Sequence, residues 1–120
     1  MSLQKVPASR AYRQLVAAAA ANGTVISPVA TMAFGTGEQP YAPESDTQLQ
    51  AEFTRAACAK SVAGVTVTAV GILRGTVSGS RVTREVGVFT ASGVLIGRRV
   101  LAPKELEPEA EIEVEIQIEY

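Results

Sequence analysis

The side chains that most enzymes use for acid–base or nucleophilic chemistry are scarce in this sequence. It contains no histidine, so the usual general base and the usual imidazole metal ligand are both missing. The single cysteine, Cys58, has no imidazole to activate it, and its position after Ala56 and Ala57 predicts a small core residue. One cysteine provides neither an internal disulfide nor a zinc site of the usual kind. We expect no enzyme activity, and no catalytic, cofactor-binding or metal-binding residue.

Three short patterns resemble ligand sites, but each lacks a part that its chemistry needs. Residues 35–37, Gly-Thr-Gly, follow a predicted strand without the lysine or third glycine of phosphate-binding loops, so a turn is the better interpretation. Arg98 and Arg99 could bind an anion, but adjacent strand residues point to opposite faces. The acidic stretch 105–119 could bind Ca²⁺, but carboxylates two residues apart on a strand lie ~7 Å apart and do not converge on one ion.

Length and composition indicate a single globular domain spanning residues 1–120, with 47% hydrophobic and 19% charged residues. No apolar run approaches the ~18 residues that cross a membrane, so we expect no membrane partner. The net charge of −1 gives no general reason to bind nucleic acid.

The charges are distributed unevenly along the chain. Residues 1–104 carry all eleven lysines and arginines but only five acids, a net charge of +6. Residues 105–120 carry seven acids and no base, a net charge of −7. One interpretation is a solvated acidic strand whose charges prevent edge aggregation. The other is head-to-tail electrostatic complementarity between neighbouring copies or partners.

The N-terminal third predicts a helix, a strand and a long loop. Apolar residues recur at helical spacing over 7–22, with Ser9 or Pro7 at the start and Asn22-Gly23 as the stop. Residues 24–34 predict a strand, which Pro28 should confine to a sheet edge or a bulge. Residues 35–46 contain two glycines and two prolines and predict a loop.

A second helix is predicted over residues 47–57. Thr47 with Gln50 fits a capping box, and Ser45 with Gln48 is a second option. The apolar face of this helix consists of residues at helical spacing: Leu49, Phe53 and Ala56.

The remaining chain predicts β-strands over 65–73, 82–90, 94–101 and 111–120, with residues 91–93 as a hairpin turn. The last strand alternates strictly between isoleucine or valine and glutamate or glutamine, which indicates one buried and one wet face. The predicted fold class is α+β: an antiparallel β-sandwich or rolled sheet with two helices packed on it.

Four segments of the chain carry a recognisable pattern. They are Leu15 with the alanine run ending at Gly23; residues 31–37; Thr47-x-Leu49-x-x-Glu52-x-x-Arg55; and Arg84-Glu85-Val86-Gly87-Val88-Phe89 followed by Gly93-x-Leu95-Ile96. In this order and spacing they resemble the N-terminal module of phage tail-collar fibre proteins of contractile-tailed phages and their prophage remnants. The resemblance extends from the first helix to Lys104.

The resemblance implies a structural, non-catalytic component of a phage or prophage tail that attaches a fibre or spike to the baseplate. It implies other tail or baseplate proteins as partners, a homo-oligomer, and a location in the virion tail after assembly in the bacterial cytoplasm. The motif residues are expected to determine shape: Gly35, Gly37, Thr47, Leu49, Glu52, Arg55, Arg84, Glu85, Gly87, Phe89 and Gly93.

The charged motif residues Glu52, Arg55, Arg84 and Glu85 are expected to hold the fold together. Glu85 shares a strand face with Gly87, which leaves room for the second predicted helix to approach. We therefore predict an ion pair between Arg55 and Glu85 across a helix–strand contact, where the planar guanidinium group can bridge a carboxylate and a carbonyl. The alternative is that all four charges are solvated, since surface pairs contribute only ~0–1 kcal/mol.

A second class of function is a small carbohydrate- or ligand-binding β-module. It would need an exposed aromatic platform, for which Tyr41 and Tyr120 are the candidates. An enzyme that uses paired carboxylates is a third class, but nothing in the sequence distinguishes a particular pair.

Overall fold

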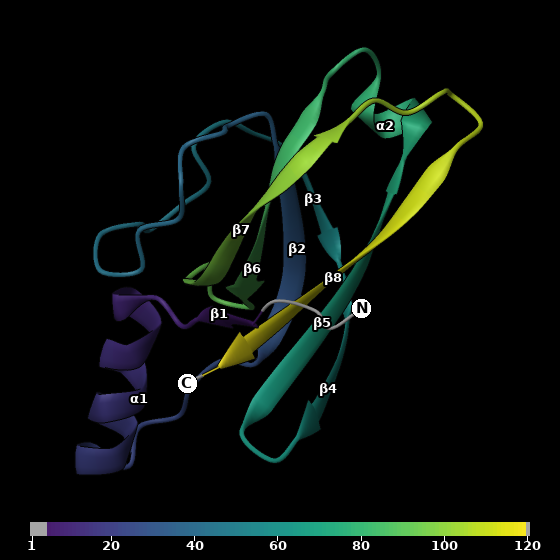
Figure 1. The fold of residues 1–120 in the computed structure, drawn as a ribbon. Helices are drawn as coiled ribbons and strands as arrows, with labels where there is room; N and C mark the ends of the chain where they lie inside the picture. The colour runs from purple at the N-terminus through teal and green to yellow at the C-terminus, as the bar shows by residue number, and fades with distance from the viewer. Residues whose placement is uncertain (1–4, 120) are drawn as a thin grey trace.

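The computed structural model describes residues 5–119 and contains eight strands and two helices in that range (Figure 1). In chain order they are β1 Lys5–Pro7, α1 Arg10–Asn22, β2 Val29–Gly35, β3 Glu52–Ala57, β4 Ala59–Ala63, β5 Thr66–Arg74, α2 Gly75–Ser78, β6 Thr83–Thr90, β7 Leu95–Lys104 and β8 Glu111–Glu119. The protein is therefore mixed α+β and mostly strand, as the sequence predicts.

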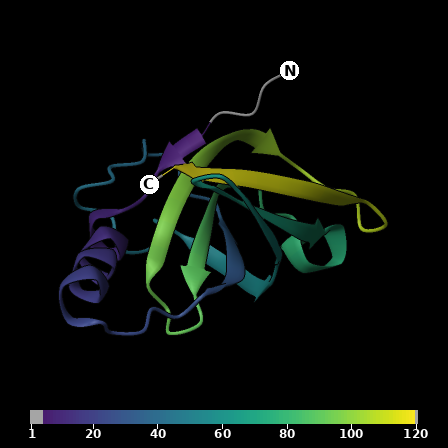
Figure 2. The same ribbon diagram turned by 90° about the horizontal axis from the view of Figure 1, so that it is seen from below.

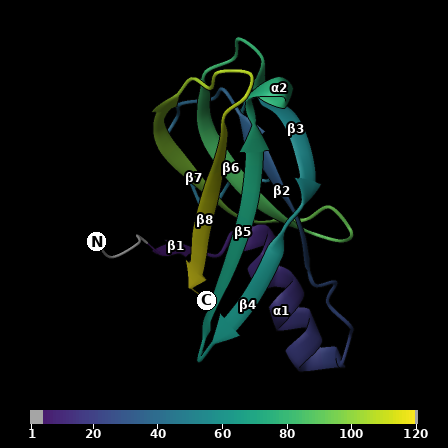
Figure 3. The same ribbon diagram turned by 90° about the vertical axis from the view of Figure 1, so that its right-hand side faces the viewer.

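The strands form two four-stranded sheets. Sheet A has the strand order β1-β8-β5-β4, and sheet B has the order β3-β2-β6-β7. Neighbouring strands are antiparallel except β1 and β8, which are parallel. Figure 3 looks onto sheet A, with β8, β5 and β4 side by side.

The main core lies between the two sheets. Sheet B contributes Phe34, Val88 and Ile96, and sheet A contributes Leu73 and Ile116, each no more than 2% exposed. The predicted alternation of β8 is confirmed, because its isoleucines and valine face the core while glutamates line the outer face. Removing this apolar surface from water, at ~25 cal/mol per Å², is the main force that holds the sheets together.

Helix α1 begins and ends where its local signals predict. The Ser9 side chain accepts a hydrogen bond from the Tyr12 amide at 3.1 Å, and Gly23 ends the helix with a φ of +70°. The Ser9 hydroxyl also donates to the Leu95 carbonyl at 2.6 Å, which fixes the helix start to β7. No residue of α1 itself is buried, and Figure 2 shows the helix beside the two sheets.

The helix predicted over residues 47–57 is wrong. Residues 47–51 belong to a loop, and Glu52–Ala57 is the edge strand β3, in which Arg55 pairs with Ala33 of β2. The helical spacing of Leu49, Phe53 and Ala56 was a weak signal, and ladder pairing with β2 outweighs it. Helix α2, a single turn after β5, is the only other helix among residues 5–119.

The β-strand predictions differ from the structure in smaller ways. Strand β2 starts after Pro28, so the proline removes no ladder hydrogen bond, and β2 lies inside sheet B between β3 and β6. A register shift between Val29 and Thr31 does disturb its start. Gly93 closes the β6–β7 hairpin with a φ of +91°, as expected. The small strands β1 and β4 were not predicted, because neither has an alternating pattern.

Candidate functional site beneath the long loop

The loop of residues 36–51 covers the outer face of sheet B. Its Leu49 side chain packs onto Ala33, Phe89 and Leu95 from three neighbouring strands, and all four residues are at most 3% exposed. The middle of sheet B is therefore buried on both faces, with the main core on one side and this small second cluster on the other.

Glycines give the loop the space to approach the sheet. A Cβ atom on Gly87 would collide with the Leu49 side chain, and one on Gly37 would collide with Gln50. A Cβ atom on Gly35 would lie 2.6 Å from the carboxylate of Glu85. A side chain at any of these three positions would force the loop or the glutamate to move.

The carboxylate of Glu85 ties both ends of the loop to β6. It is fully buried and accepts hydrogen bonds from the amides of Gly37 at 2.7 Å, Gln50 at 2.8 Å and Ala51 at 2.8 Å, and from Nε of Arg98 at 2.8 Å. Burial alone would raise the pKa of Glu85, but the Arg98 side chain and the three amides outweigh it and lower the pKa below its ordinary value. Glu85 is therefore held as an anion.

Arg98 supplies the positive charge that compensates Glu85. Its side chain is 2% exposed, with Nε on Glu85 and Nη1 3.6 Å from Oδ2 of Asp46. Nη2 is buried and has no hydrogen-bond partner among the described residues. We call the Glu85, Arg98 and Asp46 side chains, with the amides bound to Glu85, the loop clamp.

The predicted ion pair between Arg55 and Glu85 is wrong. Strand β2 lies between β3 and β6, so Arg55 extends across Ala33 and stacks over the Phe89 ring, 3.8 Å from its centroid. Arg55 forms its ion pair with Glu52 instead, with Nη2 of Arg55 2.8 Å from Oε1 of Glu52, and both side chains are about one-third exposed. Arg98 reaches Glu85 because β7 is the direct neighbour of β6.

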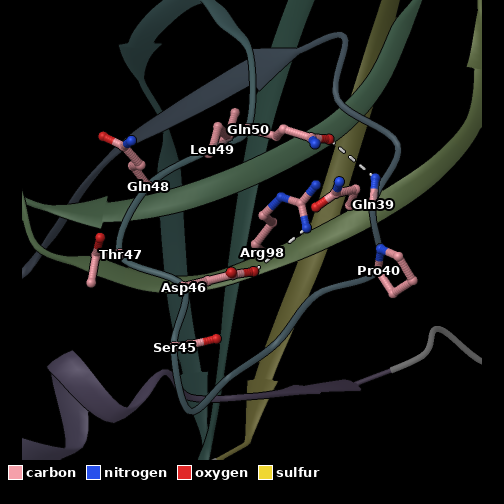
Figure 4. A pocket seen from close by; sticks show the side chains of 9 residues that line it. All are labelled: Gln39, Pro40, Ser45, Asp46, Thr47, Gln48, Leu49, Gln50 and Arg98. Atoms are coloured by element: carbon pink, nitrogen blue, oxygen red, sulfur yellow. Dashed lines mark hydrogen bonds and ion pairs between the residues drawn. The ribbon is translucent and has the colours of Figure 1, made fainter.

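A polar pocket of about 350 Å³ opens beside the loop clamp (Figure 4). The loop provides eight of its lining residues and β7 the ninth: Gln39, Pro40, Ser45, Asp46, Thr47, Gln48, Leu49, Gln50 and Arg98. These groups can donate and accept hydrogen bonds, but among them there is no activated nucleophile. Within residues 5–119, no group of three or more metal-ligating side chains comes together.

Two residues considered for other roles are engaged in the fold. Tyr41 packs partly against the core, and its hydroxyl donates to the carbonyl of Pro7 at 2.8 Å, so it is no open aromatic platform. Burial, with the nearby Asp46 charge, raises the pKa of Tyr41 to about 12. Cys58 is half-buried against the core, and burial raises the pKa of its thiol. Tyr120 lies outside the described residues.

The structure brings most of the motif residues to one place. Gly35, Gly37, Leu49, Glu85, Gly87 and Phe89 meet at the loop. Arg55 stacks over Phe89 and pairs with Glu52, and Thr47 lines the pocket. Arg84 forms an exposed ion pair with Glu38 of the loop. Gly93 lies apart in the hairpin turn.

Sequence reasoning missed Arg98 and Asp46. Arg98 was correctly expected to point away from the face of Arg99, since Arg98 is buried under the loop while Arg99 reaches the Glu115 carbonyl of β8 at 3.1 Å. The predicted hairpin was a usable signal. Glu85 is the only acid of one apolar strand and Arg98 lies in the returning strand, and a buried charge needs a partner of opposite sign.

Comparison with known proteins identifies no relative: no protein-family model, no curated protein and no solved structure matches the chain. Within residues 5–119, no helix is long and apolar enough to cross a membrane.

Proposed function

We propose that the chain is a structural, non-catalytic component of a phage or prophage tail that attaches a fibre or spike to the baseplate. The observation that carries the proposal is the convergence of the motif residues on the loop clamp and the packed cluster below it. These are the residues on which the resemblance to tail-collar fibre modules rests, and their contacts serve to shape a loop.

The chemistry of the clamp supports a structural role. A general acid must carry a proton near neutral pH, whereas the pKa of Glu85 is lowered. A general base needs a free lone pair directed at substrate, whereas Glu85 already accepts four hydrogen bonds and is fully buried.

The proposed partners are other tail or baseplate proteins and further copies of this chain. The proposed location is the virion tail, reached after assembly in the cytoplasm of the bacterial host. The shaped loop 36–51 is the surface that we assign to baseplate attachment, because the buried clamp holds its backbone in one conformation.

To test this proposal, the gene is deleted from the phage or prophage that encodes it, and the deletion particles are compared with wild-type particles. Electron microscopy should show tails without the fibre or spike, and wild-type particles should contain the chain by mass spectrometry. Particles that lack the chain in the wild type, or that keep their fibres without it, would contradict the proposal.

The second candidate function is a small carbohydrate- or ligand-binding β-module. It is favoured by the polar pocket, which Arg98 helps to line, and by the buried Nη2 of Arg98, which has no hydrogen-bond partner among the described residues. Because Glu85 and Asp46 already offset the Arg98 charge, the pocket favours a neutral, hydroxyl-rich ligand over an anion.

Calorimetric titration with a panel of neutral methyl glycosides tests this second candidate. Binding that is lost in Thr47→Val and Gln48→Ala, but kept in the distant Val25→Thr, would favour it. No heat with any member of the panel would leave only the tail proposal.

A further inference from the structure

The outer edge of β8 is only partly covered. Strand β5 pairs with β8 along its inner edge, and β1 pairs with residues 117–119 on the outer edge. Within the described chain, the six residues from Glu111 to Ile116 therefore have no strand on the outer edge. The Glu119 carbonyl accepts from Ala8, and the Glu115 carbonyl accepts from the Arg99 side chain, both at 3.1 Å. Since backbone groups alternate in direction along a strand, those of Glu111 and Glu113 also face this edge.

At the opposite edge of sheet A, no strand among residues 5–119 pairs with the outer side of β4. A two-residue turn at Gly64 joins Ala63 to its partner Thr66, so the odd-numbered residues of β4 bond to β5. The backbone groups of Lys60 and Val62 therefore face outwards. All five residues of β4 are exposed, and the Val62 side chain is 72% exposed. In Figure 3 the β4–β5 hairpin extends beyond the rest of the sheet.

These two edges fit each other in length and direction. The uncovered part of β8 is six residues long and β4 has five. Strands β4 and β8 run the same way, because each is antiparallel to β5. A neighbouring copy in the same orientation can thus place its β4 beside β8, in line with β1, and continue the sheet with parallel pairing.

The side chains around the β8 edge suit such an addition. A groove of about 380 Å³ lies along it between β7 and β8, with Leu101, Ile112 and Val114 among its apolar lining. Val62 lies on the same side of sheet A as Ile112 and Val114, as its pairing with Val67 shows. The inserted β4 would bring its exposed valine to this apolar surface.

Charge favours this head-to-tail contact over the pairing of two β8 edges. Strand β4 carries one base, Lys60, and no acid, whereas residues 105–120 carry seven acids and no base. Two β8 edges together would oppose rows of glutamates. Joining β4 to β8 avoids that repulsion, because β4 brings no acid to the acidic strand.

We propose that copies of this chain associate head to tail, with β4 of one copy adding as a parallel strand to residues 111–116 of β8 in the next. The inference depends only on the two sheet edges and not on the tail assignment. Because the two surfaces differ, the contact generates a closed ring or an open filament.

Two proline variants of the full chain test it by complementation. Val62→Pro removes an amide at the β4 edge, and Glu113→Pro removes one at the β8 edge; neither amide faces β5, and no hydrogen bond between described residues uses it. By sedimentation equilibrium at low salt, the wild type should be larger than one chain and each variant should be a single chain. Mixed in equal amounts, the variants should form a species of twice the single-chain mass. The Val62→Pro chain keeps an intact β8 edge and the Glu113→Pro chain keeps an intact β4 edge, so one contact can still form.

The control is Val25→Pro, which changes a 97% exposed valine outside the strands and should associate like the wild type. If a proline variant does not fold by circular dichroism, Val62→Glu and Glu113→Lys replace the pair. A wild type that is a single chain at high concentration, a variant mixture that stays single, or Glu113→Pro that still dimerises by itself would each overturn the proposal.

Discussion

The outer faces of the two sheets use charge in opposite ways. On sheet B, Glu85 and Arg98 are buried beneath the loop, where they hold backbone in place. On sheet A, the outer face is open, and the glutamates of β8 lie at its surface. The buried pair holds the fold together, whereas the acids of β8 lie at the surface, where Glu111 pairs with Arg74 at 3.5 Å. A charged motif residue therefore has to be located before its role can be assigned.

The largest effect is expected from Arg98→Ala. It should lower the free energy of unfolding by roughly 3–5 kcal/mol, because it leaves the buried Glu85 without its counter-charge. Arg55→Ala is the matched control, since its side chain is 35% exposed and its ion pair is at the surface, where we expect ~0–1 kcal/mol. Urea denaturation measures both. Equal, small losses would show that the two arginines are equivalent.

Truncating an apolar residue should also cost more stability on the outer face of sheet B than on the outer face of sheet A. Leu49→Ala should cost about 2–5 kcal/mol, because it opens a cavity in the packed cluster beneath the loop. Ile72→Ala, at a half-exposed position on the outer face of sheet A, should change stability by no more than ~0.5 kcal/mol. A Leu49 variant as stable as the Ile72 variant would mean that the loop does not pack on sheet B.

Acid should weaken the clamp. The pKa of Glu85 is lowered in the folded state, so its stabilisation is fully present above the ordinary glutamate pKa of ~4.3 and is lost as the pH falls through the lowered pKa. The melting temperature should therefore drop below about pH 4.3, and Glu85→Gln should flatten this part of the profile. Glu38→Gln, at a side chain 74% exposed, is the control and should keep the wild-type profile.

Salt should have the smallest effect on the stability of the single chain. Raising ionic strength from ~0.1 M to ~1 M shortens the Debye length from ~10 Å to ~3 Å, which screens exposed charges far more than buried ones. The clamp should keep its stability, so the melting temperature of Val62→Pro should move little. Association of the wild type should weaken over the same range. A wild type that associates more strongly at ~1 M salt would show that attraction between unlike charges does not contribute to the contact.

Local signals predicted the parts of the fold that local interactions determine. The start and end of α1 followed from Ser9 and Gly23, whose caps involve only neighbouring backbone. The alternation in β8 followed from one buried face. The strand over 52–57 could not be predicted in this way, because its ladder partner β2 lies about twenty residues earlier in the sequence.

Part of the candidate site was predictable from the sequence, but Arg98, Asp46 and the contacts between the members were not. Gly87 was expected to leave room on the strand face that it shares with Glu85, and it does. The occupant of that room is Leu49 on a loop, and the partner of Glu85 is Arg98. Both depend on which strand lies next to β6, and residue spacing along the chain does not encode strand order.

Hydrogen exchange at the three amides bound to Glu85 tests the central claim most directly. If Glu85 and Arg98 form a structural clamp, the amides of Gly37, Gln50 and Ala51 should exchange about as slowly as those of β6 in the wild type. They should exchange at the rate of open loop in Glu85→Ala, while amides between β5 and β8 stay protected. Fast exchange of all three amides in the wild type would contradict the account.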